Sequence, residues 1–101
     1  MGLVDFLFGG KKRRITAFLK NDAVIVDVRT QKEREKGFIE NSMHVPLDQL
    51  KDTVEELRQM NKPIIVCCES GIRSEKAAHY LRLHNLEAIN GGGWKSLKKL
   101  L

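Results

Sequence analysis

Two adjacent cysteines, Cys67 and Cys68, end an apolar run and are followed by a short polar segment. A cysteine attacks as its thiolate, so a nucleophilic cysteine needs surroundings that lower its thiol pKa. Here a glycine and an arginine follow the cysteines, just before a segment with helical character. Backbone N–H groups at a helix N-terminus and an arginine side chain both stabilise a nearby negative charge. The stretch predicts a thiolate nucleophile beside a loop that binds an anionic group.

We identify Cys68 as the nucleophile because the loop starts directly after it. Gly71 lets the chain turn so that several N–H groups point at one centre, and Arg73 adds a permanent positive charge. The carboxylate of Glu69 would raise the thiol pKa if it turned inward, so we expect it to point into solvent. Alternation along a strand sends Cys67 to the opposite face, as a core residue. The predicted anion-binding loop comprises Glu69, Ser70, Gly71, Ile72, Arg73 and Ser74.

Strand and helix patterns alternate along the rest of the chain. We expect strands at residues 23–29, 42–47, 62–68 and 86–90, and a turn at the glycines 91–93. We expect helices at 15–22, 30–37, 47–61, 72–85 and 94–101. Thr30 is the expected N-cap of the second helix and Gly37 its stop, while Ala77, Ala78 and Leu81 should face inward from the fourth.

This alternation predicts an α/β fold of three layers. A central, mainly parallel sheet of four to five strands would carry helices on both faces, with right-handed crossovers. Ligands of such sheets bind beyond the carboxyl ends of the strands. Cys68 lies at that end of its strand.

Composition restricts the class of protein. A chain of 101 residues with 42% hydrophobic and 31% charged residues fits one globular domain, and we expect a monomer. Adjacent cysteines make no disulfide framework, so reduced thiols and a cytoplasmic location fit best. No apolar run approaches the roughly 20 residues of a membrane span. The net charge of +5 suits a small anionic substrate, and because no nucleic-acid motif accompanies it we expect no nucleic-acid partner.

The first 14 residues form an apolar and basic segment ahead of a domain at residues 15–101. Its basic cluster follows the apolar stretch, which is the wrong order for a secretory signal, and Phe6 stands where a myristoylation signal needs Ser or Thr. We expect Leu3, Phe6 and Leu7 to pack on the domain as an amphipathic turn. The alternative is a weak contact with a membrane surface or a partner.

From about Ala23 to Trp94 the chain resembles the single-domain rhodaneses, the thiosulfate sulfurtransferases. The segments that carry the resemblance are VIVDVRT, GFIENSMHVPL, CESGIRS and INGGGW, in that order. The resemblance implies that Cys68 accepts sulfur as a persulfide and that the amides of residues 69–73 surround that sulfur. It also implies that Asp27 is structural and that Arg29 borders the substrate entrance. The residue types alone are equally consistent with an ion pair, so the role of Arg29 stays open.

Two positions depart from the family pattern. Phe38 replaces the usual histidine, and Glu69 replaces a residue that is often basic. A carboxylate beside the thiol weakens the attraction of thiosulfate, which favours a different natural donor. Neither change affects the nucleophile.

The implied reaction is a two-step sulfur transfer through a Cys68 persulfide. The donor would be thiosulfate or a persulfide, and the acceptor cyanide in vitro or a cellular thiol or protein. We expect no metal or organic cofactor, since His44, His79 and His84 lack ligand-like spacing with the cysteines.

Three alternatives remain open at this point. A phosphatase or arsenate reductase would have five residues between Cys and Arg, whereas Cys68 and Arg73 are separated by four. A protein-to-protein persulfide relay shares the chemistry but takes a protein surface as its substrate. A non-catalytic rhodanese-like binding module typically lacks the cysteine.

Overall fold

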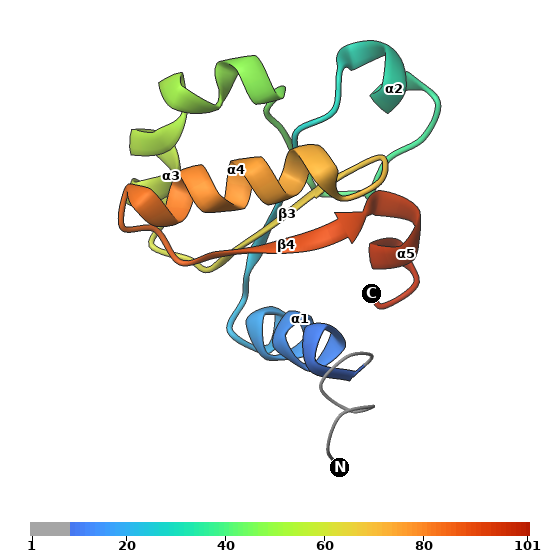
Figure 1. Ribbon diagram of the computed structural model, residues 1–101, viewed down its shortest axis with the longest axis horizontal. Helices are drawn as coiled ribbons and strands as arrows, with labels where there is room; N and C mark the ends of the chain where they lie inside the picture. The colour runs from blue at the N-terminus through green and yellow to red at the C-terminus, as the bar shows by residue number, and fades with distance from the viewer. Residues whose placement is uncertain (1–8) are drawn as a thin grey trace.

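The computed structural model describes residues 9–101. Helices and strands alternate along this range, as Figure 1 shows. Their order is α1 (Gly10–Lys20), β1 (Val24–Asp27), α2 (Gln31–Glu35), β2 (Met43–His44), the 3-10 helix η2 (Leu47–Asp52), α3 (Val54–Met60), β3 (Ile64–Cys68), α4 (Ile72–Leu83), β4 (Ala88–Gly93) and α5 (Trp94–Lys98).

The strands of the described chain form one parallel, four-stranded sheet with the order β2-β1-β3-β4. Strand β3 is buried at every position, as expected for a central parallel strand rich in β-branched residues. Asp27 at the end of β1 pairs in register with Cys67 of β3. Parallel pairing brings the carboxyl ends of β1, β3 and β4 to one edge, which is where Cys68 and its loop lie. The predicted α/β class is confirmed, at the lower of the two expected strand counts.

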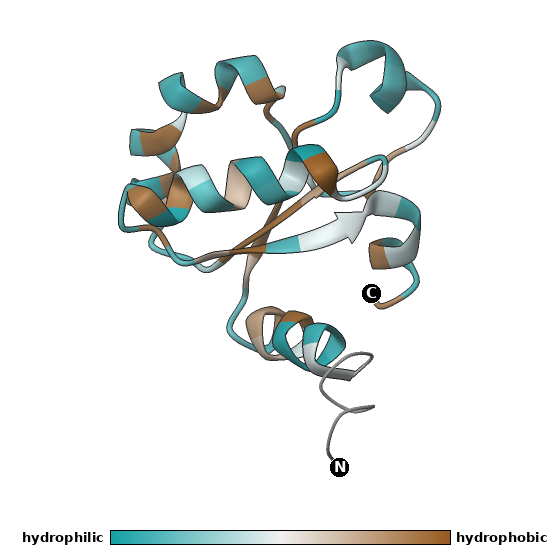
Figure 2. Cartoon of the chain, in the orientation of Figure 1, coloured by the Kyte–Doolittle hydropathy of each residue, from teal (hydrophilic) through white to brown (hydrophobic). Residues whose placement is uncertain are grey.

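Two hydrophobic cores lie on opposite faces of the sheet. One contains Leu57 of α3 and Leu81 of α4, and the other contains Ile15 of α1 and Leu97 of α5. In Figure 2 the hydrophobic colour follows β3, whereas α4 alternates between hydrophobic and hydrophilic turns. Ala77 and Ala78 are fully buried, as predicted. The expected three-layer arrangement is therefore present.

The single helix expected over residues 47–61 is wrong. This segment divides into η2 and α3, with Thr53 between them. The tighter 3-10 winding has three residues per turn, so it directs Leu47 and Leu50 to the same side. The α-helical turns that follow then bury Val54 and Leu57.

The turn expected at the three glycines is also wrong, because they extend β4. A β-bulge between Val66 and Cys67 shifts the pairing of β3 with β4. The glycines allow a close approach of two backbones: a Cβ on Gly93 would lie 2.7 Å from the carbonyl oxygen of Glu69. Glycine runs usually indicate turns, and close tertiary contacts of this kind explain why glycines occupy a strand here.

Helix α1 starts earlier than expected, at Gly10, and it includes the basic cluster of residues 11–14. The helix continues across residue 14, the expected end of the N-terminal segment. The predicted packing of Leu3, Phe6 and Leu7 lies outside the described residues. No helix within residues 9–101 has the length and apolarity needed to span a bilayer.

Candidate active site

Cys68 and Cys67 point to opposite sides of the sheet, as the strand alternation predicts. Cys68 belongs to the core beneath α4, and Cys67 belongs to the core beneath α1 and α5. Both residues are fully buried and both are free thiols. Only Cys68 lies at the point where β3 meets the loop that leads into α4.

The Cys68 sulfur is surrounded by hydrogen-bond donors from the loop and the start of α4. The backbone N–H of Gly71 donates to Sγ at 3.0 Å, and that of Ser74 donates at 3.3 Å. The Ser74 hydroxyl lies 3.2 Å from the same sulfur. Gly71 has a φ of +98°, a left-handed conformation that favours glycine and that aims its amide at the sulfur.

These contacts favour the thiolate form of Cys68. Burial raises the pKa of the Cys68 thiol, but hydrogen bonds from Ser74 and from the amides of Gly71 and Ser70 outweigh it, so the pKa is lowered overall. Burial raises the pKa of the Cys67 thiol to about 12, helped by the nearby Asp27 carboxylate. The pKa values of the two neighbouring thiols are therefore shifted in opposite directions, and Cys68 ionises more easily than Cys67.

Arg73 does not point a free guanidinium at the sulfur. Its two terminal nitrogens each donate to one carboxylate oxygen of Glu33, both at 2.7 Å. Glu33 is also the third residue of a capping box with Thr30, which starts α2 as predicted. Through this pair α2 holds the first turn of α4, and the sequence analysis missed Glu33. The Thr30-x-x-Glu33 spacing was the available signal.

Replacing Glu33 with glutamine should destabilise the protein by about 1 kcal/mol at neutral pH, because this ion pair is partly exposed. The bond from Arg73 lowers the pKa of Glu33 from 4.5 to about 2. A carboxylate whose pKa falls on folding stabilises the fold above its ordinary pKa and loses that effect as the pH falls toward 2. Urea unfolding should therefore separate wild type from Glu33→Gln at neutral pH and bring them together near pH 2. A difference unchanged with pH would contradict the assignment.

Arg29 lies at the centre of the supporting structure rather than at an open entrance. It is fully buried, and its Nε and Nη2 bind the Asp27 carboxylate at 2.8–3.1 Å. Its remaining N–H groups donate to Gly37 O, Glu33 O and the Glu69 carboxylate. The five N–H donors of the guanidinium are all engaged. We therefore assign Arg29, with Asp27, to support of the site.

The prediction that Glu69 points into solvent is only partly right. Its side chain is 45% exposed, and one carboxylate oxygen accepts from Arg29 at 2.9 Å and from the Trp94 indole N–H at 3.0 Å. The Arg29 guanidinium also stacks on the Trp94 ring, 4.6 Å from its centroid. These contacts turn the carboxylate toward Arg29 and away from the sulfur. They also attach the loop to the start of α5.

Asn90 of β4 is a site residue that the sequence analysis missed. Its side-chain nitrogen Nδ2 donates to Gly71 O at 2.9 Å, and its side-chain oxygen Oδ1 accepts from Ser74 Oγ at 2.6 Å. The residue thus contacts both groups that hold the sulfur in place. A polar amide in an otherwise apolar strand was the only signal in the sequence, and its partners follow from the pairing of β4 with β3.

No histidine is among the hydrogen-bond partners of the Cys68 sulfur in the described residues. His44 Nε2 contacts the Arg29 carbonyl oxygen at 2.8 Å, and the His84 ring packs on Tyr80. Within residues 9–101, no three His, Cys, Asp or Glu side chains are grouped so that they could hold a metal ion.

Comparison with known proteins places this chain in a family. A sequence model described as Rhodanese-like domain matches residues 14–100. A rhodanese-related protein from Thermoplasma volcanium superposes with a TM-score of 0.72 at 27% identity, covering 87% of each chain. A rhodanese-like domain protein from Staphylococcus aureus gives 0.68 at 32% identity and covers 75% of this chain and 74% of its own.

Longer relatives share the same region. A tRNA uridine(34) hydroxylase from Cronobacter sakazakii is 38% identical over 85 residues, which cover 78% of this chain and 24% of that protein. One from Salmonella paratyphi B is 42% identical over 69 residues, covering 63% and 19%. The chain thus spans about a quarter or less of the length of these relatives.

Proposed function

Because the chain belongs to the rhodanese-like domain family, we propose that it is a sulfurtransferase that carries sulfur as a persulfide on Cys68. The observation that carries the proposal is the pair of backbone N–H groups that donate to one sulfur, at 3.0 and 3.3 Å from Sγ, with the Ser74 hydroxyl 3.2 Å away. Such a pair stabilises a thiolate before the reaction and the charge on sulfur during it.

In the first step the Cys68 thiolate attacks the outer sulfur of thiosulfate, or the terminal sulfur of a persulfide donor. A bond forms between Sγ and that sulfur, while the sulfur–sulfur bond of the donor breaks. The leaving group, sulfite or a thiolate, departs with the bonding electron pair. In the second step a thiophilic acceptor attacks the outer sulfur, and Cys68 leaves as the thiolate. Neither step needs an external oxidant or reductant.

Oxyanion chemistry of the phosphatase type fits the site less well. The loop between Cys68 and Arg73 has four residues, and the Arg73 guanidinium is held in a two-bond pair by Glu33. A phosphate would have to replace that carboxylate. A binding-only role would not need the two backbone N–H groups that donate to the Cys68 sulfur.

Two candidates remain for the natural substrate on which the chain acts. A thiol or a protein cysteine would make the chain a persulfide relay. The relatives named tRNA uridine(34) hydroxylase favour a second candidate, action on tRNA, for which the chain would supply the domain they share. Mass spectrometry of tRNA nucleosides, after incubation with wild type and with Cys68→Ser, distinguishes a tRNA substrate from a thiol acceptor.

Thiocyanate formation from cyanide tests the proposal directly, with thiosulfate and a small persulfide as alternative donors. We expect turnover with at least one donor, and faster turnover with the persulfide because the Arg73 guanidinium of the loop is already paired with Glu33 and adds little attraction for the thiosulfate dianion. Absence of thiocyanate with both donors, from folded protein, would contradict a sulfurtransferase.

A further inference from the structure

The Ser74 hydroxyl lies between two groups that compete for its single proton. Ser74 Oγ is 2.6 Å from the side-chain amide oxygen of Asn90, Oδ1, and 3.2 Å from Cys68 Sγ. A hydroxyl can donate one hydrogen bond and accept two. It can therefore donate to Asn90 or to a Cys68 thiolate, but not to both at once.

The partners of Asn90 fix which way its amide faces. Gly92 N–H can only donate, and it lies 2.8 Å from Oδ1. The carbonyl of Gly71 can only accept, and it lies 2.9 Å from Nδ2, which also donates to Glu75 at 3.2 Å. A flipped amide would place donor against donor and acceptor against acceptor. The oxygen of Asn90 therefore faces Ser74, and the Ser74 proton points to it.

The same logic sets the direction of the bond to sulfur. With its proton on Asn90, the Ser74 oxygen turns a lone pair toward Cys68, so a protonated thiol donates to Ser74. When the thiol loses its proton, that lone pair faces a negative charge. Rotation of the hydroxyl from Asn90 to Sγ removes the repulsion, and Asn90 Oδ1 keeps its bond from Gly92. Only hydrogen bonds change in this exchange, and the thiol proton leaves to solvent or to the leaving group.

We propose that Asn90 is a positioning residue that holds the Ser74 proton away from Cys68 while the thiol is protonated, and releases it when the thiolate forms. The proposal rests on the proposed function only in taking Cys68 as the reacting sulfur. The consequence is that Asn90 raises the fraction of Cys68 that stays protonated, relative to a site in which Ser74 donated to the sulfur. A protonated thiol is also more resistant to oxidation.

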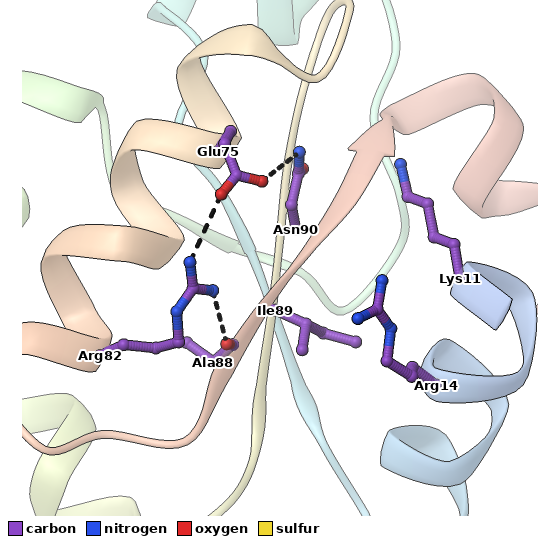
Figure 3. A pocket seen from close by; sticks show the side chains of 7 residues that line it. All are labelled: Lys11, Arg14, Glu75, Arg82, Ala88, Ile89 and Asn90. Atoms are coloured by element: carbon purple, nitrogen blue, oxygen red, sulfur yellow. Dashed lines mark hydrogen bonds and ion pairs between the residues drawn. The ribbon is translucent and has the colours of Figure 1, made fainter. Parts of the chain in front are cut away.

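The other charged groups near the sulfur fall into two sets, those paired around the loop and those beside Asn90. Figure 3 shows Asn90 beside Glu75, whose carboxylate also binds Arg82, at the wall of a cavity of about 350 Å³ that Lys11 and Arg14 line. The other charged groups that face the loop are Arg73 with Glu33, Glu69 with Arg29, and Asp27 with Arg29 and Arg34. Lys11 Nζ lies against Gly92 from α1. Substitutions at Asn90 leave these pairs in place, apart from the contact with Glu75.

The test is the pH dependence of alkylation of Cys68 by iodoacetamide, in a Cys67→Ala background so that one thiol remains. Asn90→Ala frees the Ser74 proton and should lower the thiol pKa by about one unit, the size of one hydrogen bond to a charged group. Asn90→Asp holds that proton more strongly and adds a negative charge, so it should raise the pKa. In a Ser74→Ala background, Asn90→Ala should produce no shift.

A purely structural role of Asn90 predicts something else. Loosening of the loop would move the pKa in the same direction for Asn90→Ala and Asn90→Asp, and equally with or without the Ser74 hydroxyl. Either result would overturn the proposal. If thermal unfolding shows that the Asn90→Ala variant does not fold, Asn90→Val takes its place, because valine suits a strand. The expected pKa shift is the same. Alkylation needs no sulfur donor, so a failure of sulfur transfer would leave this test intact.

Discussion

Cys68→Ser should lower thiocyanate formation by on the order of a thousandfold or more, the scale of losing a catalytic nucleophile. Serine keeps the size of the side chain and can accept the N–H groups of Gly71 and Ser74. Its hydroxyl is not ionised at neutral pH, however, and oxygen does not form a persulfide. The fold should therefore persist while the activity disappears.

Cys67→Ala is the matched control for this prediction. Cys67 is fully buried on the opposite face, and burial raises the pKa of its thiol to about 12. Alanine avoids placing an unpaired hydroxyl in that core. We expect activity within a few-fold of wild type. A loss as large as that of Cys68→Ser, in a variant with an unchanged melting temperature, would mean that both thiols take part and that Cys67 has been assigned wrongly.

Arg29→Lys should be the most destabilising conservative substitution in the chain, at about 3–5 kcal/mol. Lysine has three donors and no planar fork, so it cannot bind Asp27 at two points and also reach Gly37 O and Glu69. Asp27 would remain buried with part of its bonding lost. Domains of this size have total stabilities of roughly 5–15 kcal/mol, so the variant should unfold at much lower urea concentration.

Arg58→Lys is the surface comparison for Arg29→Lys. Arg58 pairs with Glu55 three residues away on α3, and both side chains are exposed. We expect a change below about 1 kcal/mol, as for other exposed pairs. Equal losses in the two variants would contradict the central role of Arg29.

Arg29→Lys should also change the stability of the protein at low pH. In wild type the pKa of Asp27 is lowered, because bonds from Arg29 outweigh the effect of burial. The contribution of Asp27 to stability therefore disappears only at strongly acidic pH.

The sequence was sufficient to predict the fold class and the place of Cys68 at the end of a buried strand, because both depend on local patterns. Alternating apolar and helical segments indicate a parallel sheet, and the end of a strand followed by a glycine loop and a helix places Cys68. The opposite orientation of Cys67 follows from strand geometry alone. Thr30 and Gly37 likewise act through bonds and dihedral angles of nearby residues.

Contacts between distant segments were not predictable in this way. Glu33 reaches Arg73 across forty residues, and Asn90 reaches Ser74 across sixteen. Both depend on how helices and strands pack together rather than on spacing along the chain. The glycines of β4 were misassigned for a related reason, since they allow close approaches by distant residues, such as that of the Glu69 carbonyl to Gly93. The orientation of Glu69 toward Arg29 and Trp94 also required knowledge of three segments at once.

The mass of the intact protein after incubation with a sulfur donor tests the central claim most directly. Thiosulfate and a small persulfide should each be tried, with Cys68→Ser and Cys67→Ala treated in parallel. We predict a gain of one sulfur atom in wild type and in Cys67→Ala, removed by cyanide, and no gain in Cys68→Ser. Folded wild-type protein that gains no sulfur from either donor, or a Cys68→Ser variant that still gains one, would contradict the assignment of Cys68 as the sulfur carrier.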